Sequence, residues 1–211
     1  MLAKMRKIIA NKPNWATFHK EVSPEQQKWS FDDTDPDIWR ILPQLQDPIL
    51  EIGFGNGYQL RRCLDERRDI YGTEVSQEPV ERLAEALGEG HSDRVWVDDI
   101  RRTRLNKTFS AIIDRGVFHV FNEAERLFYV QSISKLLAPD GKLVIKCFSD
   151  KEEDRGTGPF RLSKSDLESS FSPWFKITHF EHCEFQMSTE YFGGQYPKAF
   201  LAVIEWQMQP L

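Results

Sequence analysis

The stretch Ile49-Leu50-Glu51-Ile52-Gly53-Phe54-Gly55-Asn56-Gly57-Tyr58 decides the fold of this chain. It follows Pro48 and begins with an apolar run that is too short for a helix and bounded by turn residues, which predicts a buried strand. Glycines then occupy every second position, and a helical pattern starts at Gln59. A strand, a glycine turn and a helix bring backbone N–H groups and a helix N-terminus up to a ligand. Glycine suits such a turn because it tolerates positive φ and has no Cβ to hold the ligand away.

The spacing of the glycines differs from the dinucleotide-binding pattern G-x-G-x-x-G. The third glycine comes one residue early, and Tyr58 stands where the dinucleotide enzymes have theirs. An acid also lies two residues before the first glycine. This acid-x-Gly-x-Gly-x-Gly pattern resembles the first motif of class I S-adenosylmethionine (SAM)-dependent methyltransferases, in which the loop packs against the amino-acid end of SAM. The resemblance implies cofactor contacts at four positions: Glu51, Gly53, Gly55 and Gly57.

Composition places the chain among ordinary globular proteins. Its 211 residues predict a single domain, 1–211, and 40% hydrophobic with 29% charged residues is typical of such a domain. A net charge of −5 and a pI near 5.6 give no electrostatic case for a nucleic-acid or membrane partner. Three scattered cysteines argue against a disulfide framework and a zinc site, so we expect no metal. The same scattered cysteines fit a reducing cytoplasm, which is the expected location, and no signal peptide or membrane span stands out.

Residues 1–45 predict an N-terminal extension of helices and loops in front of a core sheet over residues 46–211. The extension is dense in aromatic side chains and has little clear periodicity. Aromatic residues in such a segment most often anchor packing. The functional interpretation is a lid over cofactor and substrate, and Trp29 is the residue that we expect to contact the cofactor from it.

Two acidic positions follow the next two predicted strands. Glu74 lies near the end of the strand Ile70 to Val75, at close to the spacing of about 20 residues after a glycine turn at which a carboxylate can accept hydrogen bonds from both ribose hydroxyls of an adenosine group. We expect Glu74 and Val75 to bind the cofactor, although a solvated acid at a strand end is the alternative. After the third predicted strand comes Asp98-Asp99-Ile100. In the methyltransferase pattern an acid here binds the adenine amino group and an aliphatic residue covers the ring, which implies Asp99 with Ile100, or Asp98 in place of Asp99.

The loop after the fourth predicted strand, Phe109 to Asp114, has the sequence Asp114-Arg115-Gly116-Val117-Phe118-His119. In open α/β sheets ligands lie outside the carboxyl ends of the strands, so this loop should face the sulfonium of SAM. Asn122 with Glu125 then resembles a capping box at the start of a helix. That helix should run through Leu137.

The remainder of the chain predicts three further strands. Ala138-Pro139-Asp140-Gly141 should break the preceding helix before a fifth strand, Lys142 to Phe148. A charged loop, 149–162, and a helix from Ser163 to Phe171 precede strands at Phe175 to Phe185 and Ala199 to Trp206. Five βα repeats followed by two directly joined strands predict a mostly parallel sheet with an antiparallel last strand.

Four features now agree in order and spacing with a class I SAM-dependent methyltransferase: the glycine turn, Glu74, Asp99-Ile100 and the Pro139–Gly141 turn. The resemblance covers residues 50–148. It implies an α/β, Rossmann-like, seven-stranded sheet in the order 3-2-1-4-5-7-6 with helices on both faces. The loop at 114–119 and the stretch Gly158-Pro159-Phe160-Arg161-Leu162-Ser163 are similar to a narrower group, the thiopurine S-methyltransferase-like small-molecule enzymes. No Asn-Pro-Pro-Tyr-type motif follows the fourth strand, which argues against the nucleic-acid and protein-glutamine methyltransferases that carry it.

The resemblance implies methyl transfer from SAM to a small-molecule acceptor, with S-adenosylhomocysteine as the product. Asp114 and Arg115 are expected at the cofactor, and Phe118 and Arg161 at the substrate, although either arginine could instead brace a loop. His119 is the candidate catalytic base because its unperturbed pKa is near 6.5, and its alternative role is to pack against the following helix. The acceptor atom (S, O or N) and the oligomeric state stay open. Two other functions also stay open: a nucleotide-dependent oxidoreductase, and a non-catalytic domain that binds SAM or a nucleotide.

Overall fold

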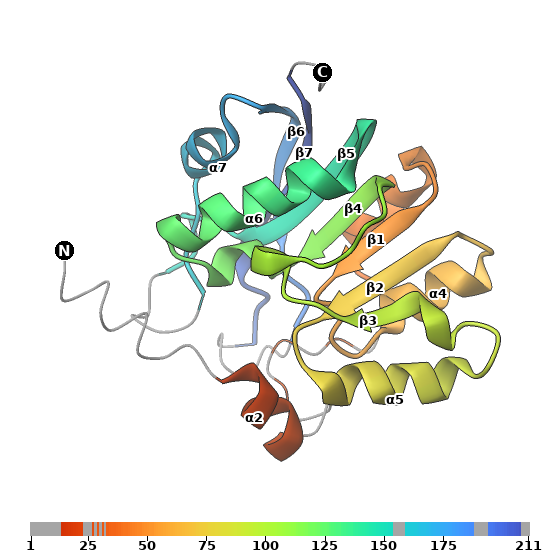
Figure 1. Cartoon of the computed structure of the whole chain (residues 1–211). Helices are drawn as coiled ribbons and strands as arrows, with labels where there is room; N and C mark the ends of the chain where they lie inside the picture. The colour runs from red at the N-terminus through yellow and green to blue at the C-terminus, as the bar shows by residue number, and fades with distance from the viewer. Residues whose placement is uncertain are drawn as a thin grey trace.

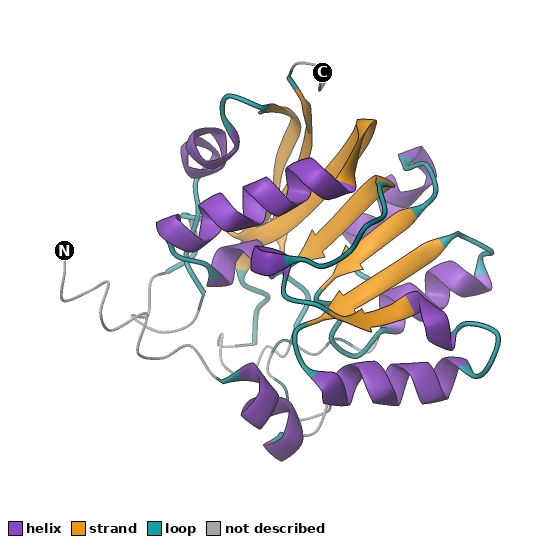
Figure 2. Ribbon diagram, viewed as in Figure 1, coloured by secondary structure: helices purple, strands orange, loops and turns teal. Residues whose placement is uncertain are grey.

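The computed structural model describes residues 14–22, 27, 29, 31, 33–153, 159–187 and 194–207. These residues form a central seven-stranded sheet with helices on both faces (Figures 1 and 2). The strands lie in the order β3-β2-β1-β4-β5-β7-β6. The fold class and the strand order predicted from the sequence are therefore confirmed.

The first five strands run parallel, and β7 is antiparallel to both of its neighbours, β5 and β6. The carboxyl ends of the parallel strands consequently meet at one edge of the sheet. Strand order reverses at β1, which lies between β2 and β4, and in open α/β sheets this is where ligands bind. The strands are β1 Ile49–Ile52, β2 Ile70–Glu74, β3 Val95–Val97, β4 Phe109–Arg115, β5 Leu137–Phe148, β6 Phe175–Glu184 and β7 Lys198–Trp206.

Two helical layers cover the sheet. Apolar side chains of α6 and α7 pack on one face together with Leu50, Ile112 and Ile145, whereas those of α3, α4 and α5 pack on the other face with Ile49 and Ile113. Figure 1 shows α6 in front of β4 and β5. The helices are α2 Trp15–Glu21, α3 Pro36–Ile41, α4 Tyr58–Asp65, α5 Gln77–Leu87, α6 Glu123–Leu136 and α7 Lys164–Phe171, with 3-10 helices η2 Leu42–Gln44, η3 Ser92–Arg94, η4 Ile100–Arg102 and η5 Phe118–Val120.

Helix α6 begins as its sequence predicts and ends differently. Asn122 and Glu125 form the predicted capping box. At its other end the helix passes directly into β5 at Leu137, with no separate turn before the strand. The pairing of β5 with β4 instead shifts in register, so that the residues after Leu137 form a bulge inside the strand. Gly141 fits there because a Cβ would lie 2.8 Å from the Leu137 side chain and 2.9 Å from the Ala138 carbonyl oxygen.

Candidate functional site

The glycine turn lies at the carboxyl end of β1, where the strand order reverses. Gly53, Gly55 and Gly57 all have positive φ, between 57° and 72°. A Cβ on Gly53 would lie 2.3 Å from Cγ2 of Val117, so this glycine allows the turn to pack against the loop after β4. A Cβ on Gly55 would have no described atom within 4 Å. Gly55 therefore leaves space in which a ligand can approach the main chain.

The Glu51 carboxyl group is buried beside this turn. Its Oε1 accepts a hydrogen bond from Nε2 of Gln59 at 3.3 Å, whereas its Oε2 has no partner among the residues that the structure describes. Burial raises the pKa of Glu51 to about 8, and the charge of Arg115 opposes the shift only in part. Because buried carboxylate oxygens are normally hydrogen-bonded, this oxygen is suited to a cationic ligand group.

Glu74 ends β2 with its carboxyl group close to the glycine turn. Its Oε1 lies 3.9 Å from the position that a Cβ on Gly53 would take, and its Oε2 accepts a hydrogen bond from Val75 N at 2.7 Å. Burial raises the pKa of Glu74, while hydrogen bonds from neighbouring backbone N–H groups oppose the shift. Val75 is 39% exposed. This strand end thus offers a hydrogen-bond acceptor next to an exposed apolar side chain.

Asp98, Asp99 and Ile100 follow β3, and the two aspartates differ in their hydrogen bonds. Asp99 caps η4 and accepts from Nε and Nη2 of Arg101 at 2.9 and 2.7 Å. Asp98 accepts from Arg104 N at 2.8 Å with one oxygen, while its buried second oxygen has no partner in the described part of the chain. Ile100 is buried in the core. Asp99 has the predicted position and Asp98 has the available oxygen, so the choice between them stays open.

Asp114 and Phe118 hold the loop after β4 in place. The fully buried Asp114 carboxylate accepts hydrogen bonds from Val117 N at 2.7 Å, Phe118 N at 3.0 Å and the Tyr129 hydroxyl at 2.8 Å. Burial raises its pKa to about 6. Phe118, predicted at the substrate, is instead a core residue, since η5 turns its ring between Tyr129 and Phe171 at centroid distances of 5.0 and 5.3 Å. Both side chains therefore shape the site from behind the loop.

His119 is buried and not poised as a base. Its Nδ1 accepts a hydrogen bond from Phe148 N at 3.0 Å, so the proton of the neutral ring is on Nε2. The ring contacts Phe148 and Phe185 at centroid distances of 4.9 and 5.8 Å. Burial, helped by nearby arginine charges, lowers the pKa of His119 to about 3. His119 is therefore a packing residue, but its ring contacts within the described part of the chain are with Phe148 of β5 and with Phe185 and not with the helix that follows it.

The two arginines expected at the ligands brace loops in this structure. Arg115 donates from Nε to Oδ2 of Asp35 at 2.8 Å and from Nη2 to the Gln186 carbonyl. Arg161 donates from Nη1 to the Pro159 carbonyl at 2.7 Å. Both charges still lie near the carboxyl edge of the sheet, since Arg115 ends β4 and the Arg161 guanidinium lies 5.5 Å from the ring centroid of Phe148, which ends β5.

Trp29, the residue expected to contact the cofactor from the extension, packs beside an apolar cluster. The ring lies against a group formed by Phe148, Phe185, Met187 and Ala199, and 5.0 Å from the ring centroid of Phe18. The described part of the extension thus reaches the carboxyl end of β5. Its role as a lid remains a prediction.

Sequence reasoning missed two charged residues in this region, Lys146 and Asp35. Lys146 lies in β5 and Asp35 directly before α3, and both side chains are fully buried. The available signal for Lys146 was a single charge inside the apolar run Leu143 to Phe148. Asp35 gave no comparable signal, because it belongs to a stretch rich in aspartate that is typical of a turn.

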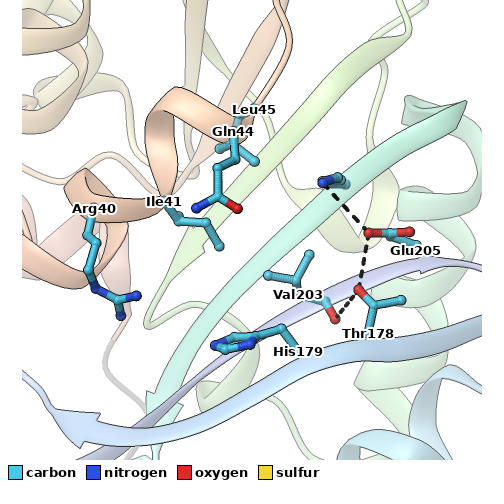
Figure 3. A pocket seen from close by; sticks show the side chains of 9 residues that line it. Arg40, Ile41, Gln44, Leu45, Thr178, His179, Val203 and Glu205 are labelled. Atoms are coloured by element: carbon cyan, nitrogen blue, oxygen red, sulfur yellow. Dashed lines mark hydrogen bonds and ion pairs between the residues drawn. The ribbon is translucent and has the colours of Figure 1, made fainter.

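A pocket of about 270 Å³ lies elsewhere, between the α3–η2 segment and the sheet (Figure 3). Its lining includes Lys142 and Glu205, which are 3.9 Å apart, and Thr178, which donates to Glu205 at 3.1 Å. Lys142 lies near the amino end of the paired part of β5, whereas Phe148 ends that strand. The pocket is therefore distant from the glycine turn.

Within the described ranges, no group of three or more His, Cys, Asp or Glu residues could hold a metal ion. Among the helices of the same ranges, none combines the length and apolar character needed to span a bilayer.

Comparisons with known proteins agree on one family. The family described as "Methyltransferase domain" matches residues 50–143. Thiocyanate methyltransferase 1 of Brassica oleracea is 26% identical over 65% of this chain and 62% of its own length, and a probable thiol methyltransferase 2 of Arabidopsis thaliana is 26% identical over 57% and 54%. These alignments span roughly three fifths of the relatives' length. A SAM-dependent methyltransferase structure from Anabaena variabilis superposes with a TM-score of 0.64 at 20% identity, over 81% of this chain and 82% of that one.

The fold, the position of the glycine turn and the match to the methyltransferase domain are therefore consistent with one another. Low identity to the solved structure supports the fold alone, while the match over residues 50–143 covers the strands that carry the glycine turn, Glu74 and Asp99. By its fold and by this domain match, the chain is similar to the SAM-dependent methyltransferases over residues 50–143.

Proposed function

We propose that this protein transfers a methyl group from SAM to a small-molecule acceptor and releases S-adenosylhomocysteine. The carboxyl edge of the sheet suits SAM in three respects: open space at Gly55, a buried carboxyl oxygen of Glu51 without a described partner, and the Glu74 carboxylate at the end of β2. SAM carries a cationic amino group, ribose hydroxyls and an adenine ring. Glu51 fits the amino group and Glu74 the hydroxyls, and Asp98 or Asp99 fits the adenine.

SAM supplies an electrophilic methyl group on a positively charged sulfur. The protein's part is to hold the acceptor in line with that methyl group and to exclude water. The Asp114 hydrogen bonds fix the loop that faces this position, and Trp29 with the Phe148–Phe185 cluster supplies apolar surface near it. A small, partly apolar acceptor suits these surroundings.

The proposal about the acceptor atom rests on the neutral state of His119. A histidine whose pKa is about 3, with Nδ1 engaged by a backbone N–H, removes no proton efficiently near neutral pH. An acceptor that ionises by itself avoids this need, and a thiol with a pKa near 8.5 does so in part. The names of the thiocyanate and thiol methyltransferase relatives agree with a sulfur acceptor. We therefore propose a small thiol or a similarly soft anion, in the cytoplasm.

Calorimetric titration with S-adenosylhomocysteine tests the cofactor assignment. We expect micromolar or tighter binding and no binding of NADH or FAD, the ligands of the oxidoreductase alternative. Glu74→Ala should weaken S-adenosylhomocysteine binding by about 1.5–3 kcal/mol, because a hydrogen bond to a charged group is lost. The matched control is Glu81→Ala, which removes an exposed acid of α5. Equal affinities of the Glu74 variant and the wild type would refute the site.

A further inference from the structure

A group of charged and polar residues, fully buried at its centre, joins four parts of the chain. We call it the Asp35 cluster, and its members are Asp35, Asp37, Arg115, Lys146 and Gln186. Asp35 and Asp37 belong to the start of α3, Arg115 and Lys146 to the carboxyl-terminal parts of β4 and β5, and Gln186 to the segment after β6. Asp35 and Lys146 lie 111 positions apart in the sequence.

Lys146 stands at the centre of this cluster. Its Nζ donates to both carboxylate oxygens of Asp35 at 2.7 and 2.8 Å, to Oδ2 of Asp37 at 2.7 Å and to Oε1 of Gln186 at 2.7 Å. Arg115 donates to the same Asp35 carboxylate at 2.8 Å. Two cations and two carboxylates thus neutralise one another in a site where the side chains of Lys146 and Asp35 are fully buried.

Asp35 has a second set of contacts that fixes the backbone. Its carboxylate caps α3 by accepting from Asp37 N at 3.1 Å and from Ile38 N at 3.4 Å. Burial alone would raise its pKa, but the charges of Arg115 and Lys146 outweigh burial and hold the pKa below its ordinary value. The start of α3 is therefore fastened to the ends of β4 and β5 by one ionised side chain.

The N-terminal arm, by which we mean the described residues among 14–35, has contacts at three places near the carboxyl edge of the sheet. At one end α2 lies against α5, which follows Glu74, as Figure 1 also shows. Trp29 packs beside Phe148 and Phe185, at the β5 side of that edge. Asp35 then enters the cluster between these strand ends and α3.

The Asp35 cluster is also connected to the cofactor side of the edge. The charge of Arg115 acts on Glu51 by lowering its pKa. Arg115 lies between Asp114, which anchors the loop after β4, and Val117, whose side chain packs on Gly53. A shift of Asp35 that moves Arg115 should therefore affect Glu51 and Gly53, two residues that we assign to SAM binding.

The energetics favour a role in positioning over one in bulk stability. Replacing a buried ion pair with apolar side chains is often neutral or stabilising, whereas removing one partner is strongly destabilising for the charge left behind. Such a cluster favours a single position of the arm, because any shift of Asp35 leaves the buried Lys146 with fewer hydrogen-bond partners. An apolar contact of the same size would tolerate small shifts.

We propose that Asp35 and Lys146 are positioning residues that seat the N-terminal arm over the carboxyl edge of the sheet and couple that seating to cofactor binding. The coupling rests on the proposed function, whereas the seating does not. Neither residue needs to touch SAM.

Hydrogen–deuterium exchange of α2 with and without S-adenosylhomocysteine tests the proposal. The variant is Asp35→Asn, since asparagine also caps helices well and removes only the charge. The control is Asp33→Asn, which removes an exposed acid whose described hydrogen bonds go only to Thr34. In Asp35→Asn we expect exchange over residues 15–21 to be about tenfold faster and S-adenosylhomocysteine affinity to be about tenfold weaker. Bound S-adenosylhomocysteine should slow this exchange in the wild type and not in the variant.

Each outcome decides the proposal. Unchanged α2 exchange in Asp35→Asn would overturn the seating, and faster exchange with unchanged affinity would overturn the coupling. If S-adenosylhomocysteine does not bind the wild type, the proposed function fails, while the ligand-free exchange still decides the seating. If peptides of β1 and β4 also lose protection, the Asp35→Asn variant has unfolded. In that case Asp37→Asn, which leaves the Asp35–Lys146 pair in place, is measured instead. We expect the same changes in α2 exchange and in S-adenosylhomocysteine affinity, but smaller ones.

Discussion

At the scale of single residues, Glu51 has opposite effects on folding and on binding. Its ordinary pKa is near 4.5, and burial raises it to about 8 in the folded protein. Between these values the folded state keeps a proton that the unfolded state releases. The contribution of Glu51 to stability is therefore greatest below pH 4.5 and is lost as the pH rises through 8. A bound ammonium group would supply the missing partner for the ionised form.

Glu51→Gln should separate these two effects. We expect the ligand-free variant to be more stable than the wild type by about 4–5 kcal/mol at pH 8.5 and about equally stable at pH 4.5, because glutamine has no charge to bury. We also expect weaker S-adenosylhomocysteine binding. Urea unfolding at the two pH values measures the first effect and calorimetry the second, with Glu81→Gln as the exposed-acid control. A stability difference that is the same at both pH values would show that Glu51 does not titrate as described.

At the scale of the elements, the junction of α6 and β5 depends on one glycine. Gly141→Ala places a Cβ 2.8 Å from a Leu137 side-chain atom and 2.9 Å from the Ala138 carbonyl oxygen, and the backbone oxygen cannot move aside cheaply. We expect a loss of about 1–3 kcal/mol in the free energy of unfolding, as for other overpacked sites. Gly90→Ala is the matched control, because a Cβ there would meet no described atom within 4 Å. Equal urea midpoints for the two variants would contradict the bulge.

The same junction shows how far the sequence could predict the elements. Apolar runs and turn residues predicted the seven strands, the resemblance to the methyltransferases implied their order, and the capping box at Asn122 was confirmed. The break at Pro139–Gly141 became a bulge, because pairing with β4 starts at Leu137, and register is a property of two strands and not of one. Local pattern alone could not supply it.

The candidate site was predictable to a different degree. Glu51, the glycines and Glu74 lie near the ends of strands whose order the family resemblance implies, so their neighbourhood followed from topology. His119 is buried against Phe148, which lies 29 residues away in the sequence, and Lys146 pairs with Asp35, which lies 111 residues away. No periodicity or motif reports such contacts, which depend on how loops fold back on the sheet.

At the scale of the whole molecule, two places compete as ligand sites: the carboxyl edge of the sheet and the pocket in Figure 3. The edge is where the parallel strand ends and the glycine turn converge, while the pocket lies by β6 and the far end of β5. We expect S-adenosylhomocysteine to slow amide exchange in peptides that cover residues 53–58, 74–77 and 98–101. Exchange in β6, residues 175–184, should not change.

This footprint discriminates because residues 53–58, 74–77 and 98–101 include none of the residues that line the pocket. Ligand at the edge contacts backbone groups after β1, β2 and β3, whereas ligand in the pocket would contact the side chains of Arg40 and His179. Glu74→Ala should abolish the protection at the edge at a concentration that saturates the wild type, since its affinity is about 10- to 100-fold weaker. Arg40→Ala should leave the protection intact. Protection of residues 175–184 that is lost in Arg40→Ala would place the ligand in the pocket and would remove Glu74 from the site.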